Sequence, residues 1–166
     1  MIMCEACVKD PLTHSFDVIT MNHQNNKRTH VFFTSFKSLK DYSHTDSICR
    51  HFDTRLHQIG EEPWSWIIDC KYLSSKHMVH VNTSITVLRK LTDKYNKHIQ
   101  SIYLINAGPI LKTILVTFSP FITKEFANSI VKLNGSSLEL YEEFKRIGWS
   151  AHDIEPVIRR LQGDYC

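Results

Sequence analysis

Residues 102–133 read IYLINAGPILKTILVTFSPFITKEFANSIVKL, and this stretch decides the fold that we expect. It opens with an apolar run at 102–105, which the turn-forming sequence NAGP interrupts at 106–109. Apolar residues then recur along one wide side of a predicted helix at 109–121, with Val116 on another side. A surface helix needs only one apolar stripe. A helix that is apolar over more of its circumference must therefore be covered by the core, a second chain or a bound apolar ligand.

Strand and helix patterns alternate upstream of this stretch. Residues 16–21, 29–36 and 64–70 have the apolar runs of strands, and 29–36 is apolar on both faces, which is typical of a strand buried on both sides. A helix is expected at 46–59, capped by Thr45. Another helix is expected from Asn82 or Thr83 onwards, with its inner face formed by Ile85, Leu88, Leu91 and Tyr95.

The alternation continues downstream. Thr123 is expected to cap a second, short helix, and a strand follows at 130–133. Ser136 and Glu139 form a capping-box pattern for another helix that ends at Gly148, and a last short helix follows. Strands that alternate with helices predict an α/β fold with a mostly parallel sheet of about five strands flanked by helices.

Three short motifs resemble the CRAL-TRIO lipid-binding domain family, in the order in which that family has them. The sequence IID stands at 67–69, with LS at 73–74; YLINA follows at 103–107; and SPFIT at 119–123 comes after the apolar helix, with a closing Ile130. The likeness extends over about residues 18–147. The family includes phosphatidylinositol, tocopherol and retinaldehyde carriers.

The resemblance implies that helix 109–121 is a movable gate over a hydrophobic lipid cavity. The apolar pattern alone favours a different interpretation, a core helix buried by its own sheet. If the helix is a gate, the side chains that line or close the cavity are expected to be Ile110, Leu111, Ile114, Leu115, Phe118, Phe121, Ile122, Phe126 and Ile130. The cavity floor is expected to come from Trp66, Ile68, Tyr103 and Ile105.

The expected headgroup site departs from the family pattern. Members similar to the phosphatidylinositol carrier usually have Lys just before the residue that matches Ile130, where this chain has Ser129. They also have an acidic residue before the strand that contains Tyr103, and Lys97 stands at that position here. A basic rim for an anionic headgroup is the alternative, made with Ser129 by Lys94, Lys97, His98, Lys124 and Lys132. The same lysines also fit an ordinary solvated face.

The chain is expected to form an arm at 1–15 and a single lipid-binding domain at 16–166. A bare domain is expected, without the helical region that usually precedes it in the family. An apolar helix over an open groove leaves a sticky patch, and such patches are commonly interfaces, so homodimerisation is a secondary hypothesis.

Composition and charge limit the partners. The net charge of +3 is too mild to indicate nucleic acid, and it suits transient contact with an anionic membrane surface. Residues 1–10 do not read as a secretion signal, and no apolar run reaches the roughly 20 residues of a membrane-spanning helix. A cytoplasmic protein that is peripheral to membranes is expected.

The five cysteines do not predict a disulfide framework, because their number is odd. Cys4 and Cys7 form a C-x-x-C pair, with His14 beyond it. A structural zinc site needs further ligands at readable spacing, and a redox pair should stand where a strand leads into a helix. The pair is therefore interpreted as incidental, and no metal or cofactor is expected.

His77 and His80 form H-x-x-H, but no third ligand stands nearby, so surface histidines are the expected interpretation. Asp69 stands at the end of a predicted strand, where α/β enzymes place catalytic groups. No base or nucleophile accompanies it, and a carboxylate that accepts backbone N–H groups in the following turn is favoured.

Three functions remain open. The first is non-catalytic binding and transfer of a phospholipid, with phosphatidylinositol or a phosphoinositide as a candidate. The second is a regulatory protein-interaction domain that has this fold and no lipid. The last is a small α/β enzyme centred on Asp69.

Overall fold

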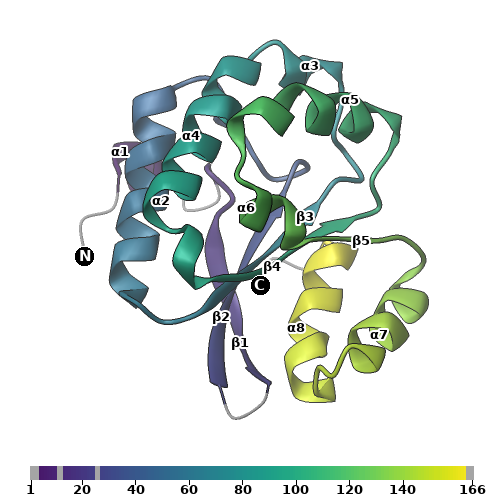
Figure 1. Cartoon of the computed structure of the whole chain (residues 1–166). Helices are drawn as coiled ribbons and strands as arrows, with labels where there is room; N and C mark the ends of the chain where they lie inside the picture. The colour runs from purple at the N-terminus through teal and green to yellow at the C-terminus, as the bar shows by residue number, and fades with distance from the viewer. Residues whose placement is uncertain (1–3, 11–12, 25–26, 164–166) are drawn as a thin grey trace.

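A five-stranded sheet lies at the centre of the computed structural model, which describes residues 4–10, 13–24 and 27–163 (Figure 1). The strands follow one another in the sheet in chain order: β1 (Asp17–Gln24), β2 (Lys27–Ser35), β3 (Trp64–Asp69), β4 (Ile99–Ile105) and β5 (Ile130–Leu133). β1 and β2 form an antiparallel hairpin, and the β2–β3, β3–β4 and β4–β5 pairs are parallel. The predicted mostly parallel α/β fold is confirmed.

Helices cover both faces of this sheet. The helical segments are α1 (Glu5–Lys9), α2 (Thr45–Ile59), α3 (Ser75–Met78), α4 (Val81–Lys94), η1 (Asn96–His98), α5 (Pro109–Phe118), η2 (Ser119–Phe121), α6 (Lys124–Asn128), α7 (Ser137–Arg146) and α8 (Ala151–Gln162). In Figure 1, α7 and α8 stand apart from the larger group formed by α2, α4, α5 and α6. Each group therefore has its own core against the sheet.

The two cores divide the strand residues by parity. Phe32, Trp64 and Leu104 point to the core shared with α2, α4, α5 and α6. Their sequence neighbours Phe33 and Tyr103 point to the core shared with α7 and α8. Because successive side chains of a strand point to opposite faces, a sheet covered on both sides needs apolar residues at consecutive positions.

Capping residues fix several helix ends as the sequence predicts. The Thr123 hydroxyl accepts the Phe126 N–H at 3.2 Å at the start of α6. At the start of α7, the Ser136 N–H donates to the Glu139 carboxylate at 2.7 Å, and the Ser136 hydroxyl accepts the Glu139 N–H. These contacts satisfy backbone donors that the first helical turn leaves without partners.

Two predicted helix boundaries differ in detail. Thr45 does not cap α2; His44 holds that position, and the Thr45 hydroxyl bonds the Thr83 hydroxyl of α4 at 2.7 Å. The predicted helix 109–121 is α-helical only to Phe118 and continues as the 3-10 turn η2. Pro120 explains this change, because it has no N–H for the next α-helical hydrogen bond.

The first fifteen residues include a short helix rather than the expected arm. α1 buries Cys7 completely, and His14 behind it is 1% exposed. His77 is also buried, on the unexpected short helix α3, so the interpretation of the H-x-x-H residues as surface histidines is wrong for His77.

Among the residues that the structure describes, no helix combines the length and the apolar composition that crossing a bilayer requires.

Candidate functional site

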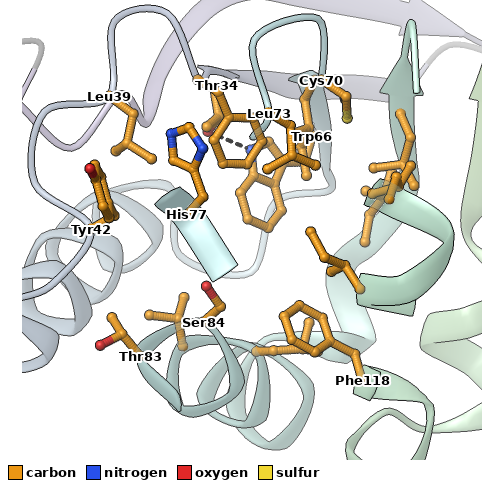
Figure 2. Close-up of a pocket in the computed structure, with 18 of the residues that line it drawn as sticks. Thr34, Leu39, Tyr42, Trp66, Cys70, Leu73, His77, Thr83, Ser84 and Phe118 are labelled. Carbon is orange, nitrogen blue, oxygen red and sulfur yellow. Dashed lines mark hydrogen bonds between the residues drawn. The ribbon is translucent and has the colours of Figure 1, made fainter. Parts of the chain in front are cut away.

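An apolar cavity of about 210 Å³ lies between the sheet and the helices of its larger group (Figure 2). The strands supply its floor: Thr34 from β2, Trp66 and Ile68 from β3, and Ile102 and Leu104 from β4. These residues share one parity, which directs them to the same face of the sheet. The Trp66 indole N–H donates to the Thr34 hydroxyl at 2.8 Å, so the polar nitrogen of Trp66 is satisfied by a neighbouring floor residue and needs no ligand.

Five helices, α2 to α6, and several loops form the other walls. α4 contributes the largest share of the helical wall, and α5 contributes four further side chains. The helical lining side chains are Ile48 and Phe52 of α2, His77 and Met78 of α3, Val81, Thr83, Ser84, Val87, Leu88 and Leu91 of α4, Leu111, Ile114, Leu115 and Phe118 of α5, and Phe126 of α6. The lining is predominantly aliphatic and aromatic, which is typical of pockets for apolar ligands.

Most of the side chains predicted to contact lipid line this cavity. They are Trp66, Ile68, Leu111, Ile114, Leu115, Phe118, Ile122, Phe126 and Ile130. Ile110 and Phe121 belong to the expected segment but are not part of the lining. The Phe121 ring instead lies under the Arg89 guanidinium, 4.4 Å from its carbon atom.

The prediction that Tyr103 and Ile105 form the floor is wrong. Both side chains lie on the opposite face of the sheet, in the core with α7 and α8, where the Tyr103 ring packs edge-on against Phe144. Their neighbours Ile102 and Leu104 take the floor positions. The run 102–105 is apolar throughout, so it contains no alternation from which the inward parity can be read.

α5 is apolar but poorly buried. Leu111 is its only buried residue, Ile114, Leu115 and Phe118 are half-buried, and Val116 is 67% exposed. An ordinary core helix buries its apolar stripe against its neighbours. α5 lacks that contact because part of its inner side faces the cavity.

The loop that leads into α5 is fixed by hydrogen bonds at Asn106 and Ala107, and Gly108 beyond them has open space beside it. Asn106 has a positive φ of 52°, and its side-chain oxygen accepts the Gly135 N–H at 3.0 Å, while the Asn134 side chain accepts the Ala107 N–H at 3.1 Å. These bonds join the ends of β4 and β5. A side chain at Gly108 would meet no atom within 4 Å outside its chain neighbours, so there is open space on that side of the backbone between the anchor and α5.

His77 is the buried polar group of the lining that lacks a full set of partners. The Ser74 N–H donates to its Nδ1 at 3.1 Å, and Nε2 has no hydrogen-bond partner among the described residues. An Nδ1 that accepts leaves the ring hydrogen on Nε2, which makes Nε2 a donor. Burial lowers the pKa of His77, so the ring is neutral at pH 7.

The residues predicted to contact a headgroup do not line the cavity. They are Lys94, Lys97, His98, Lys124, Ser129 and Lys132. Lys94 donates to the Asp53 carboxylate at 3.0 Å, and the Ser129 hydroxyl donates to the Phe126 carbonyl at 2.6 Å. A basic rim at the cavity therefore stays a prediction.

Asp69 has the structural contacts that the sequence favours. Its carboxylate accepts the Lys71 N–H at 3.1 Å and the Ser35 hydroxyl at 3.4 Å, and burial raises its pKa. It lies outside the cavity lining, on the face of the sheet occupied by Ser35 and Ile67.

A second group of side chains was only partly readable from the sequence, which shows the C-x-x-C pair and His14 but not the fourth member. Cys4, Cys7 and His14 lie close together, as their short spacing allows, and His51 of α2 completes the group. His51 is 44 positions from Cys7, and no motif links it to the cysteine pair. The cavity residues His77, Met78 and Leu73 were also missed, because the sequence around them does not predict α3.

The profile of the CRAL/TRIO domain matches residues 14–146, which is most of the chain. The chain therefore belongs to the CRAL/TRIO domain family, a family of lipid-binding domains, as the resemblance of its motifs implies.

Among solved structures, 23 chains match this fold. One is the crystal structure of Sfh5, with a TM-score of 0.63 and 14% sequence identity, over 80% of this chain and 52% of that chain. This chain thus spans about half the length of Sfh5, and at this identity the likeness concerns the fold alone. A search of curated proteins gives no match.

Proposed function

We propose that this protein binds a lipid, with a phospholipid as the principal candidate, and transfers it between membranes without catalysis. The observation that carries the proposal is the apolar cavity of about 210 Å³ under a helix whose apolar side is only partly buried. An α/β domain with an ordinary packed core has no such space, since protein interiors are close-packed.

The energetics suit an alkyl chain. Each methylene moved from water into an apolar cavity contributes about 0.8 kcal/mol, so a long chain is retained with few polar contacts. The volume of 210 Å³ is below the roughly 300–1,000 Å³ of pockets that hold drug-sized ligands. The cavity in this conformation therefore suits one slim chain, and a two-chain lipid requires α5 to move outward.

Transfer requires a lower barrier rather than a stronger interaction. A chain is equally dry in the bilayer and in the cavity, so burial alone gives no preference for the protein. We propose that α5 and η2 open at a membrane surface and close in water, with the chain around Gly108 as the hinge. The partial burial of α5 and the open space on the Cβ side of Gly108 support this motion. A cytoplasmic protein that visits membranes transiently fits the same proposal.

The polar end of the ligand is proposed to meet His77. Its Nε2–H is buried without a partner among the described residues, and an unsatisfied buried donor costs about 1–3 kcal/mol. An ester carbonyl or a phosphoryl oxygen would satisfy this donor. Because the ring is neutral, it does not by itself select for a charged headgroup.

A matched pair of substitutions on α5 tests the proposal. Leu115 lines the cavity, whereas its neighbour Val116 is 67% exposed. Leu115→Trp fills the cavity and is expected to reduce the co-purifying lipid at least tenfold, whereas Val116→Trp leaves it unchanged. Native mass spectrometry and lipid extraction of the full chain measure the bound lipid, and a liposome assay with phosphatidylinositol and phosphatidylcholine measures transfer.

Two outcomes would contradict the proposal. If the unmodified protein carries no lipid and transfers none, a regulatory interaction domain with this fold becomes the better interpretation. If both tryptophan variants bind lipid as the unmodified protein does, the lipid site lies elsewhere.

A further inference from the structure

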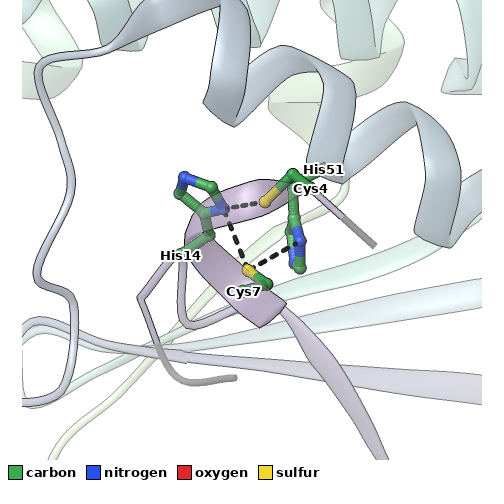
Figure 3. Close-up of side chains that lie close together, drawn as sticks. All are labelled: Cys4, Cys7, His14 and His51. Carbon is green, nitrogen blue, oxygen red and sulfur yellow. Dashed lines mark hydrogen bonds between the residues drawn. The ribbon is translucent and has the colours of Figure 1, made fainter. Parts of the chain in front are cut away.

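Four side chains with ligand atoms of the kind that zinc prefers converge between α1 and α2 (Figure 3). The Cys4 Sγ lies 3.4 Å from the His14 Nδ1, and the Cys7 Sγ lies 3.2 Å from the same nitrogen and 3.3 Å from the His51 Nδ1. All four atoms lie within 4.8 Å of one another. Around a tetrahedral Zn²⁺ with bonds of about 2.0–2.3 Å, neighbouring ligand atoms are roughly 3.3–3.8 Å apart, so the group has nearly that size.

The outer nitrogen of each imidazole has an acceptor that orients the ring. The His51 Nε2 lies 2.9 Å from the Phe16 carbonyl oxygen, which can only accept, so Nε2 carries the hydrogen. The His14 Nε2 lies 3.2 Å from the Asp41 carboxylate and 3.4 Å from the Ser47 hydroxyl. In its neutral form, each ring with the hydrogen on Nε2 presents the Nδ1 lone pair to the sulfurs. Zinc-binding histidines are held in the same way, by an acceptor at the other nitrogen.

When both rings are neutral, thiol hydrogen bonds alone cannot satisfy this group. Three sulfur–nitrogen contacts connect it, but the two thiols supply at most two hydrogens, and the single lone pair of the His14 Nδ1 faces both sulfurs. One contact is therefore left without a hydrogen. A cation at the centre accepts an electron pair from all four atoms, so no contact remains unsatisfied.

We propose that Cys4, Cys7, His14 and His51 bind a structural Zn²⁺. Two thiolates and two imidazoles in a tetrahedral arrangement are typical of zinc, and the C-x-x-C spacing is that of many such sites. Four protein ligands leave no position for water or substrate. Cys7, His14 and His51 are at most 3% exposed, which further closes the site. Binding converts two thiols to thiolates and releases two protons.

The metal would attach the N-terminal segment to the domain. α1 has five residues, which is too short for a helix that is stable by itself, and Cys7 is its only buried residue. His14 and Asp41 also line the cavity described above, so the zinc would fix one end of its wall. The proposal does not depend on what the cavity binds.

The test uses the full chain, purified without chelators. Elemental analysis and native mass spectrometry are expected to give roughly one zinc per chain. Replacement by Co²⁺ is expected to give a thiolate-to-cobalt charge-transfer band and the intense visible absorption of tetrahedral cobalt. Cys4→Ser and Cys7→Ser are expected to lose the metal on gel filtration. Cys49→Ser is the matched control, because Cys49 is a buried cysteine of α2 outside the group.

Asp41→Asn leaves all four ligands in place and is expected to weaken zinc binding by about 10- to 100-fold, as loss of an orienting carboxylate does elsewhere. The proposal is overturned by a metal-free protein that gives no thiolate band with Co²⁺. It is equally overturned by zinc that both serine variants retain, by iron in place of zinc, or by a Cys4–Cys7 disulfide in the protein as isolated.

Discussion

In the proposed lipid site, the buried Nε2 of His77 is the candidate partner for the polar end of the ligand. Its Nδ1 accepts the Ser74 N–H at 3.1 Å, and its Nε2 has no partner among the described residues. The ring packs against Phe36 and Tyr42, with centroid distances of 4.9 and 5.0 Å, so it cannot turn Nε2 towards solvent without disturbing both. A ligand that reaches Nε2 therefore adds a bond to a ring that is already held in place.

His77→Phe is expected to weaken binding of a phospholipid with a fluorescent acyl chain by about tenfold. One neutral hydrogen bond contributes about 0.5–1.5 kcal/mol, and about 1.4 kcal/mol corresponds to a tenfold change in affinity. A fluorescent alkane of the same length, which has no acceptor, is expected to bind the unmodified and variant proteins equally.

His80→Phe is the control, since His80 contacts the Tyr42 ring but is not part of the cavity lining. An equal loss of phospholipid and alkane binding in His77→Phe would mean that the residue acts only by shaping the wall.

Single residues were the part of the site that the sequence predicted least well. The apolar character of Leu111, Ile114 and Leu115 was readable, because helical spacing places them on one side. The position of His51 beside Cys7 was not, because it depends on how α2 packs against the N-terminal segment. Chain spacing contains no information about such a contact.

At the scale of elements, α5 differs from the other long helices. α4 buries Thr83, Val87, Leu91 and Thr92, whereas α5 buries only Leu111. A segment with few buried contacts opens at a lower free energy than the core around it.

Hydrogen exchange should therefore distinguish the two helices. The amides of α5 are expected to exchange faster than those of α4 in the lipid-free protein, and faster still when phosphatidylinositol-containing vesicles are added. Bound lipid in solution is expected to slow them, because it fills the space beneath the helix. α7 is the internal reference, since it packs on the other face of the sheet. If the amides of α5 exchange at the same rate as those of α4, and vesicles do not change that rate, α5 is not a gate.

Asp53 joins α2 to α4. Its carboxylate bonds the Lys90 ammonium at 2.7 Å, the Lys94 ammonium at 3.0 Å and the Tyr95 hydroxyl at 2.5 Å. Burial alone would raise the pKa of Asp53, but these hydrogen bonds outweigh it and lower the pKa to about 2. The ionised carboxylate therefore stabilises the packing of one cavity wall against its neighbour.

The sign of the pH effect follows from this shift. The folded-state pKa lies below the ordinary value of 3.8, so the contribution is complete above about pH 4 and is lost as the pH falls towards 2. Asp53→Asn is expected to lower the free energy of unfolding at pH 7 by about 1–2 kcal/mol after solvent screening, and to flatten its decline below pH 4. Urea denaturation across this range measures both effects.

Asp93→Asn, at an exposed position of α4, is the control and should reproduce the unmodified pH curve. A steep decline below pH 4 that persists in Asp53→Asn would assign the acid sensitivity to other groups.

Elements were predictable where local chemistry decides them. β5 has the predicted bounds, and Thr123, Ser136 and Glu139 cap their helices as expected, because capping depends on residues within one turn. The parity of β4 was not predictable, because both faces of that strand are buried.

At the scale of the whole molecule, one sheet separates two cores. Phe144, Trp149 and Ile154 are buried on the side of α7 and α8, whereas the opposite side contains the cavity. The alternation of strands and helices predicted this architecture. The empty space depends on the sum of side-chain volumes around a tertiary contact, which no local pattern reports.

The cavity of about 210 Å³ is also expected to make the lipid-free protein sensitive to hydrostatic pressure. Unfolding eliminates internal void, so the unfolded chain occupies less volume and compression favours it. A chain seated in the cavity removes that void, and the loaded protein should withstand pressures that unfold the empty one.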